Sequence, residues 1–233
     1  MSEEEVRQIG LDLSLMSAEV LELLLADEAL EEGFFGEVLG ANRQRPEILN
    51  VLLTHYRTPF EIRAEVSGIL HLPAPDEKQL ALFRKAAEET PAEEKKQTLL
   101  TKLRMMGVGE KIQLAMRGSR EVRNLLLKDT NKEVVKTVMQ NPKMTESEVE
   151  LIAMNRNISE EILRTIGSRR EWMKNYAVTL ALVTNPKTPI GVSVSQIPRI
   201  RKSDLVKFEK NRNLPEAVRA AAKGLLAKQK KQP

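Results

Sequence analysis

Residues 182–189 read LVTNPKTP, and two other stretches repeat the same order of residue types: LLTHYRTP at 52–59 and VMQNPKMT at 138–145. Each has two apolar residues, a polar one, a turn, a basic residue and a Thr. The first stretch differs, because it carries His-Tyr where the other two have Asn-Pro. The apolar pair is expected to end a helix, since Asn can adopt the left-handed conformation that terminates it and Pro cannot continue it.

New helices are predicted to begin directly after these stops. Thr145 and Glu148 have the spacing of a capping box, in which each side chain accepts a hydrogen bond from the other residue's backbone amide. NRNISEEI at 155–162 and NRNLPEAV at 211–218 fit a related form, with the second Asn of each stretch as the cap. This pair is 56 residues apart, whereas the Asn-Pro-Lys stretches are 44 apart, so the predicted repeat is irregular.

After residue 117 the stop and start signals recur roughly every 11 to 17 residues, which predicts short helices joined by tight turns. A helix this short cannot bury its apolar face alone, but helices stacked in series form one continuous core. We therefore expect an all-α protein built as a solenoid. The apolar positions expected in its core are Val122, Leu125, Leu126, Val134, Val135, Val138, Val149, Ile152, Ile162, Leu163, Ile166, Val178 and Leu182.

The stretches RREWMKNYAV at 169–178 and VTNPKTP at 183–189 resemble the leucine-rich repeat variant unit, and the wider similarity is to HEAT and armadillo-type α-solenoids. The resemblance covers residues 110–225 well and residues 46–69 weakly. It implies a right-handed superhelix of short helices that binds partners, without a shared catalytic site. The chain departs from these families in its variable unit length, in a strand-like alternation GVSVS at 191–195, and in residues 1–45, which do not match.

Charge divides the chain into two halves. Residues 1–100 hold 10 Lys and Arg against 20 Asp and Glu, whereas residues 101–233 hold 27 against 13, so the halves carry −10 and +14. This asymmetry indicates an acidic and a basic module, or one body whose basic end meets an anionic partner. The alternative is that the two halves simply attract each other.

The predicted organisation has four parts. The two prolines of HLPAPD at 71–76 interrupt a helical pattern and mark a joint. The four predicted parts are an acidic helical N-terminal segment with one weak repeat copy (1–72), connecting helices (73–109), basic α-solenoid repeats (110–226) and a disordered basic tail (227–233).

The composition leaves little room for catalysis. The chain has no Cys and two His, which excludes disulfides, thiolate catalysis and Cys/His zinc or iron–sulfur sites. GVGEK at 107–111 lacks the spacing and the Ser/Thr of a phosphate-binding loop, which favours an inter-helix turn. His55 is interpreted as a helix-end residue rather than a general base, and His71 as a joint residue. We therefore expect no enzyme activity, no catalytic residue, no cofactor and no metal.

The chain is predicted to be cytoplasmic and to have no membrane partner. It starts with the acidic sequence MSEEE rather than a basic and then apolar segment, and no run of about 18 apolar residues occurs.

Basic residues recur at nearly every predicted unit of the C-terminal half, and they are the candidate binding residues. Trp172, the sole Trp, has basic neighbours that suit an exposed anchor, but its four-residue spacing to Tyr176 and Leu180 favours burial. The candidate partner-binding residues are Arg156, Arg169, Arg170, Trp172, Lys174, Arg199, Arg201, Lys202 and Arg212.

These residues support two functional hypotheses. The leading one is a non-catalytic scaffold that binds an unidentified protein partner through its repeat surface. The alternative is sequence-nonspecific binding of a nucleic-acid backbone along the basic half. Residues 101–233 contain only three aromatic residues, too few for a series of base-stacking platforms, so a duplex is the better nucleic-acid candidate. A further alternative is that Lys and Arg merely cover helix exteriors.

Overall fold

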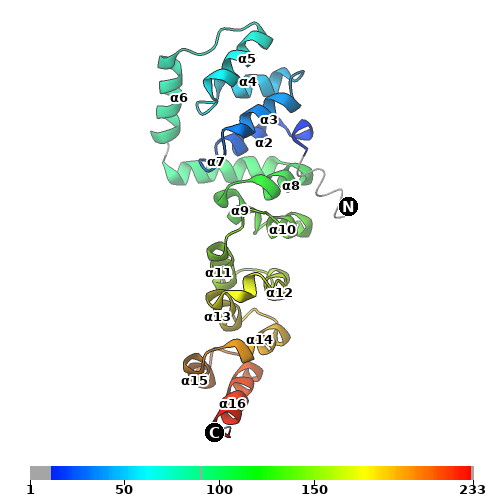
Figure 1. The fold of residues 1–233 in the computed structure, drawn as a ribbon, viewed down its shortest axis with the longest axis vertical. Coiled ribbons are helices and arrows are strands. Elements are labelled where there is room, and N and C mark those ends of the chain that lie inside the picture. The colour runs from blue at the N-terminus through cyan, green and yellow to red at the C-terminus, as the bar shows by residue number, and fades with distance from the viewer. Residues whose placement is uncertain (1–11, 90, 232–233) are drawn as a thin grey trace. The chain divides into compact units, whose positions relative to one another are not determined.

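A computed structural model describes residues 12–89 and 91–231, apart from the side chains of residues 86–88, 92, 230 and 231. Within these residues the regular secondary structure is helical, with no strand (Figure 1), which confirms the all-α prediction. The chain divides into two compact units, residues 1–142 (unit 1) and 143–233 (unit 2). In the part of the chain that the structure describes, no helix is long and apolar enough to cross a membrane.

Unit 1 is built around α2, which packs against both α4 and α8. Ser17 caps α2 by accepting the Val20 N–H, and its hydroxyl donates to Glu110 in the first turn of α8 at 2.6 Å. The elements of unit 1 are η1 (Leu13–Leu15), α2 (Ala18–Leu25), α3 (Gly33–Ala41), α4 (Pro46–Thr54), α5 (Phe60–Leu70), α6 (Glu77–Glu89), α7 (Ala92–Met105), α8 (Val108–Arg117), α9 (Arg120–Leu126) and α10 (Lys132–Val138).

The division into units differs from the predicted organisation. Residues 110–142 were expected to continue into the basic repeats, but α8 to α10 belong to unit 1 with the acidic helices. The reason is that α8 buries Ile112 and Leu114, and α8 packs on α2, more than 80 residues earlier in the chain. The predicted joint at 71–76 is an interruption inside unit 1, where His71 ends α5 in the left-handed conformation with φ 55°.

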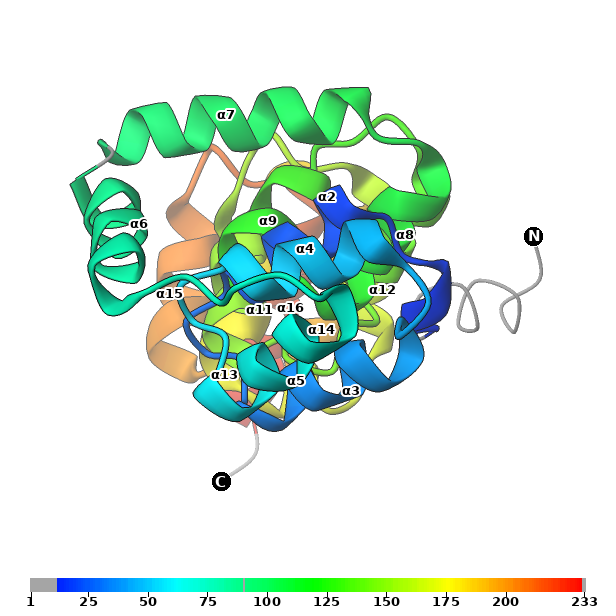
Figure 2. The ribbon, with the colours of Figure 1, turned by 90° about the horizontal axis from the view of Figure 1, so that it is seen from above.

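Helix α6 follows this joint and is set to the side of α2–α5 in both views (Figure 1 and Figure 2). None of its described side chains is buried, and Leu82 and Phe83 are exposed. Helix α6 therefore contributes little to the core of unit 1.

Unit 2 consists of three helix pairs within its described residues. The first helix of every pair has nine residues, and short 3₁₀ segments connect one pair to the next. The elements are α11 (Glu146–Met154) and α12 (Glu160–Ser168), then η2 (Trp172–Lys174), α13 (Tyr176–Thr184) and α14 (Ile190–Gln196), then η3 (Ile197–Arg199), α15 (Lys202–Lys210) and α16 (Glu216–Lys231).

The same five-residue turn joins the two helices of each pair. Asn155, Asn185 and Asn211 end the first helices, and each accepts the backbone N–H two residues later, at 2.9, 2.9 and 3.0 Å. The residue three positions after each Asn is buried: Ile158, Thr188 and Leu214. These equivalent Asn residues are 30 and 26 residues apart, which explains why the two NRN stretches, two pairs apart, showed a spacing of 56.

Unit 1 contains a related turn after α4. There His55 stands in the place of Asn, and its Nδ1 accepts the Arg57 N–H at 3.4 Å. The alignment of 52–59 with 182–189 therefore reflects the same local structure, and His55 is the helix-end residue that the sequence predicts.

Two details of the predicted helix signals are wrong. Asn185 ends α13 with φ −75° and ψ 121°, not in the left-handed region, and His71 is the one non-Gly residue with positive φ among those described. The side-chain bond of Asn185 to the Lys187 N–H shapes the turn without left-handed backbone. Asn157 and Asn213 do not cap the next helices, because α12 begins at Glu160 with Ser159 at its N-cap and α16 begins at Glu216, so each Asn lies two residues before the cap position.

Two segments of unit 2 are more helical than expected. The GVSVS alternation lies inside α14, where Ser193 is buried and no strand is present to pair with it. Helix α16 runs to Lys231 and so includes most of the predicted disordered tail 227–233, because Ala, Lys and Gln are strong helix formers. Residues 232 and 233 lie outside the described part of the chain.

Most of the predicted core positions are buried. Leu125 and Val135 are half-buried, and the other eleven positions are buried.

Candidate interaction surface

The first helices of the three pairs lie parallel. At their N-terminal ends, the Asn175 side chain donates to Glu146 at 2.7 Å and the Tyr176 hydroxyl donates to Asp204 at 2.6 Å. At the C-terminal end, the Asn185 side chain donates to the Ala153 carbonyl at 2.7 Å. Matching ends of α11, α13 and α15 are therefore neighbours, with the turns at one end and the 3₁₀ links at the other.

All nine predicted binding residues lie in unit 2, and all but one of them lie outside its α-helices, in the turns and links. Arg156 and Arg212 belong to the turns, together with Lys187, which the prediction omitted. We call these three exposed cations the turn row. The remaining basic residues form the link cluster: Arg169, Arg170, Lys174, Arg199, Arg201 and Lys202, the last of which begins α15.

Contacts between the two links hold the link cluster together. The Arg201 guanidinium stacks over the Tyr176 ring at 4.2 Å from the ring centroid, and the Arg201 N–H donates to the Tyr176 hydroxyl at 3.3 Å. Arg199 donates to the Met173 carbonyl at 3.3 Å. The structure thus joins residues that are about 25 residues apart in sequence.

The charge network at this end centres on Asp204. The hydrogen bond from Tyr176, followed by that from Lys207, lowers the pKa of Asp204. In turn, Asp204 raises the pKa of Lys207. Burial, followed by the bond to Asp204, raises the pKa of Tyr176. At neutral pH the Asp204 charge is therefore compensated by groups of unit 2 itself.

Trp172 does not present an exposed anchor, because it is only 7% exposed and the Arg169 guanidinium covers its ring at 4.5 Å. Burial is the outcome that the sequence favoured, but the reason differs. Trp172 lies in η2, and Asn175 caps α13 after it, so Trp172, Tyr176 and Leu180 do not share one helix.

A surface groove of about 370 Å³ is lined by all three of these parallel helices. Helix α13 lies between α11 and α15 along it and has no charged residue from Tyr176 to Thr184. The groove is lined by Glu150 and Met154 of α11, by Ala177, Leu180, Ala181 and Thr184 of α13, and by Asp204, Lys207, Phe208 and Asn211 at α15.

Sequence reasoning missed this groove. The charge-free stretch YAVTLALVT at 176–184, between a charged link and the turn that carries Lys187, was the available signal. Its residues 177, 180, 181 and 184 follow the spacing of one helix face. That this face stays open could not be derived, since the sides of the groove come from helices about 30 residues away in both directions.

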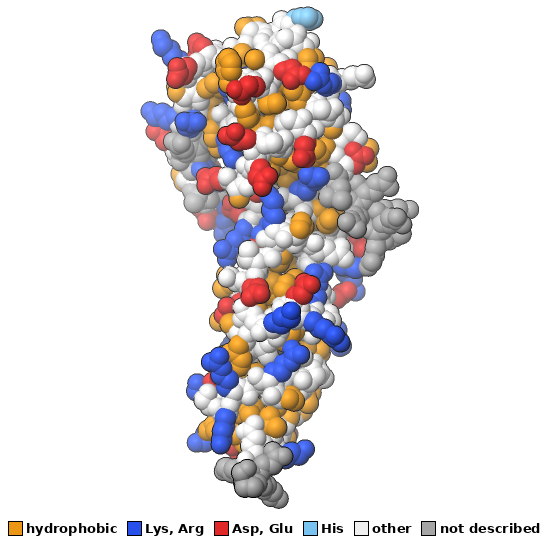
Figure 3. All heavy atoms as spheres, in the orientation of Figure 1, with side chains coloured by type: hydrophobic (Ala, Val, Ile, Leu, Met, Phe, Trp, Pro, Cys, Tyr) orange, Lys and Arg blue, Asp and Glu red, His pale blue; other side chains and the backbone are white. Residues whose placement is uncertain are grey.

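Unit 2 is basic around this groove. It holds 18 Lys and Arg against 9 Asp and Glu, a net charge of +9. Figure 3 shows Lys and Arg side chains spread over the unit 2 helices, between hydrophobic patches. None of the three turn-row cations forms an ion pair with any residue that the structure describes.

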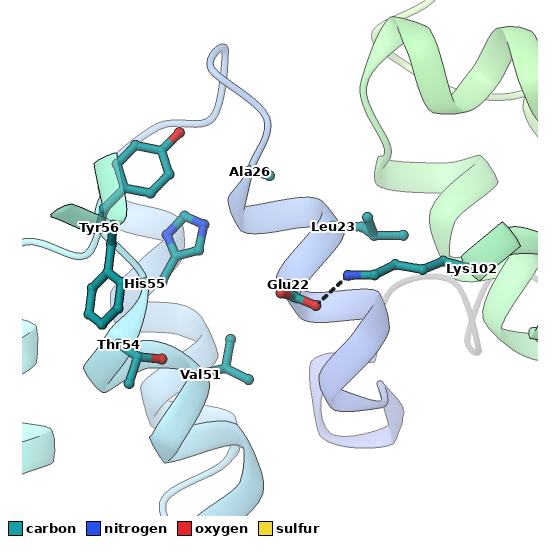
Figure 4. A pocket seen from close by; sticks show the side chains of 9 residues that line it. Glu22, Leu23, Ala26, Val51, Thr54, His55, Tyr56 and Lys102 are labelled. Carbon is teal, nitrogen blue, oxygen red and sulfur yellow. Dashed lines mark hydrogen bonds and ion pairs between the residues drawn. The ribbon is translucent and has the colours of Figure 1, made fainter. Parts of the chain in front are cut away.

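Unit 1 contains a second hollow, at the ends of α2 and α4 (Figure 4). Glu22 and Lys102 form an ion pair at 2.8 Å on one side, and the ring of His55 stacks on Tyr56 on the other. Burial, and then the neighbouring Arg57, lowers the pKa of His55 to about 4. His55 is therefore neutral at pH 7 and acts as a turn acceptor.

The described residues contain no group of three His, Cys, Asp or Glu side chains that could hold a metal ion. GVGEK at 107–111 is a helix start, where the Gly107 N–H donates to Glu110 at 2.8 Å. Comparisons of the chain with known protein families, with curated proteins and with solved structures find no match.

Proposed function

We propose that the chain is a non-catalytic scaffold that binds a protein partner in the groove of unit 2. We further propose that the helix pairs of unit 2 form a right-handed α-solenoid of the HEAT-like or leucine-rich repeat variant type. The recurrent turn, the constant first helices and their parallel arrangement support a repeat architecture.

The observation that carries the proposal is the charge-free face of α13. Along this face the groove is lined by the half-buried Ala177 and Leu180, the buried Ala181 and the exposed Thr184. A charge-free face in a hollow is unusual for a helix in so basic a unit. Apolar hollows with polar edges are typical of protein–protein contact sites, because burial of the apolar floor provides affinity and the edges provide specificity.

Binding of a nucleic-acid backbone is the second candidate function. Its support is the number of unpaired exposed cations in the turn row and the link cluster, which could contact phosphates. Two features disfavour it. Glu150 lies in the groove and would repel phosphates, and Trp172 and Tyr176 carry arginines on their rings and cannot stack on bases in this arrangement.

The test is capture of partners by the tagged full chain at low salt, with and without nuclease. Two variants are compared: Thr184→Glu, which puts a charge on the groove floor, and Ser195→Glu on the exposed side of α14. They are matched, because both hydroxyls are exposed in short helices and bond to backbone carbonyls of their own helix.

We expect a stoichiometric protein that survives nuclease, is lost with Thr184→Glu and is retained with Ser195→Glu. Nucleic acid bound directly, with all proteins lost on digestion, would instead support the second function and reject the first.

A further inference from the structure

We propose that the segment bound in the unit 2 groove has an apolar centre with acidic residues on both sides. This inference rests on the proposed function and specifies the chemistry of the partner. Three features of unit 2 carry it: the floor of the groove, the turn row at one end and the link cluster at the other.

The floor requires an apolar centre. Helix α13 offers the half-buried Ala177 and Leu180, and α11 adds Met154, which is 58% exposed. Ala181 and Phe208 also line the groove, but they are buried. Glu150 lies midway along α11 at the side of this floor and would repel an acidic residue placed there. The centre of the occupant is therefore apolar and uncharged.

The turn row selects an acidic residue at the C-terminal end of the groove. Each of its cations follows a groove residue within three positions: Arg156 after Met154, Lys187 after Thr184, and Arg212 after Asn211. Three unpaired cations gathered where three parallel helices end are complementary to carboxylates. These cations also balance the partial negative charge at the C-terminal ends of the helices. That role alone would not require an apolar floor between the turn row and the link cluster.

The link cluster provides a second cationic site at the N-terminal end. Arg201 stacks over Tyr176, which directly precedes the groove residue Ala177 in the sequence. Lys174, two residues before Tyr176, is exposed. Three carboxylates lie at this end: Asp204 is bonded to Tyr176 and Lys207, Glu146 accepts from Asn175, and Glu171 belongs to the link. The six cations of the link cluster outnumber these carboxylates, so an acidic side chain of a partner meets net positive charge here.

The length of α13 sets the spacing between the acidic groups. Nine residues at the helical rise span about 13 Å. An extended segment crosses this distance with about four residues, and a helical segment with about nine. Acidic clusters separated by an apolar centre of one of these lengths would reach both cationic ends.

The experiment measures binding of fluorescent synthetic peptides to the full chain by anisotropy. The probes carry two Asp at each end around a Leu/Ala centre of four or of nine residues. Three controls accompany them: the same centres between Lys pairs, Ser/Gly centres between Asp pairs, and a DNA duplex.

Two charge-reversal variants locate the site. One changes the turn row (Arg156→Glu, Lys187→Glu, Arg212→Glu), and the other changes three exposed cations on α12 and α16 (Arg164→Glu, Lys223→Glu, Lys228→Glu). Both lower the net charge by the same amount, and the helix content of both is verified by circular dichroism before binding is measured.

We expect one of the Asp-ended apolar peptides to bind about tenfold more tightly than its Ser/Gly counterpart, from partial burial of its apolar side chains. Reversal of the turn row should weaken it about tenfold, since each exposed ion pair contributes modestly, and the control reversal less than about twofold. Thr184→Glu should weaken it as well.

Equal binding of the Ser/Gly peptides, or equal loss in both reversal variants, would overturn the inference, because charge alone would then explain binding. If no peptide binds while a protein is still captured in a manner that depends on Thr184, the segment chemistry is wrong and the proposed function stands. If the duplex binds most tightly and displaces the peptides, both fail.

Discussion

Replacement of Asn185 by Ala should destabilise unit 2 far more than the same change at Asn155, although both residues occupy the same position of the same turn. The Asn185 side chain is 4% exposed and makes three hydrogen bonds: it donates to the carbonyls of Ala153 and Asn155 at 2.7 and 3.0 Å and accepts the Lys187 N–H at 2.9 Å. The exposed Asn155 side chain makes one bond, to the Asn157 N–H.

The magnitude follows from these bonds. Each contributes about 1 kcal/mol net, and the buried Ala153 carbonyl would lose its partner without access to water, so Asn185→Ala should cost about 3 kcal/mol of the free energy of unfolding. Loss of one exposed bond in Asn155→Ala should cost about 0.5 kcal/mol. The expected difference between the variants is therefore about 2.5 kcal/mol, by the same reasoning.

Urea unfolding followed by Trp172 fluorescence measures this difference. Trp172 is the sole Trp and is buried in unit 2, so its emission reports on that unit. Asn141→Ala provides a control in unit 1, where the buried Asn141 donates to the Ala115 carbonyl at 2.8 Å. Asn141→Ala should shift the urea unfolding transition that is followed by circular dichroism. Equal costs for Asn185→Ala and Asn155→Ala would refute the reasoning.

Three further predictions concern single side chains. The pKa of His55 is about 4 in the folded chain and about 6.5 when unfolded. The contribution of His55 to the free energy of unfolding is therefore fully present above pH 6.5 and is lost as the pH falls toward 4. Partial exposure limits the loss to about 1–2 kcal/mol. This loss of stability is measured by urea unfolding of unit 1 between pH 7 and pH 4.5. The variant His55→Asn should lose the extra pH dependence, and an unchanged pH profile in this variant would contradict the prediction. Gly167→Ala should destabilise unit 2 by about 1–3 kcal/mol, because the new Cβ would lie 2.5 Å from Val192 Cγ1, whereas Gly191→Ala, with open space around it, should stabilise by about 0.5–1 kcal/mol. Trp172 fluorescence compares these two variants, and the same sign for both would contradict the packing argument. Tyr176→Phe should cost about 1 kcal/mol in the same assay, through loss of the Asp204 and Arg201 bonds, and no cost would show that this network contributes nothing to stability.

The sequence was sufficient for part of the local structure of unit 2, although not for the backbone conformation of Asn185 or for the caps expected at Asn157 and Asn213. The turn after α13 depends on residues within a few positions of Asn185, and such short-range chemistry can be recognised in the order of residues. The capping box of Thr145 and Glu148 is confirmed for the same reason, with hydrogen bonds at 3.1 and 3.3 Å.

Long-range packing explains what the sequence did not reveal. Whether an Asn side chain stays exposed, as at 155, or bonds to another helix pair, as at 185, depends on which helix lies beside it. The boundary between the units depends on the packing of α8 on α2. The GVSVS alternation lies in α14, and no strand occurs among the described residues with which it could pair.

The candidate site was predicted in part. The turns and links that carry its charges contain eight of the nine predicted residues, and Lys202 adjoins them, but Trp172 is covered and the groove between the charges was not foreseen. A groove is a property of three neighbouring helices, whereas periodicity describes one helix at a time.

The three first helices of unit 2 have nine residues each and the three turns have five, whereas α12 and its link are longer than α14 and its link. All variation in spacing thus falls on the second helices and the links, whereas the first helices, which form the length of the groove, are constant. A pair could gain or lose residues there and still present the same face in the same register. Such an architecture separates the part of each helix pair that lines the groove from the part whose length varies.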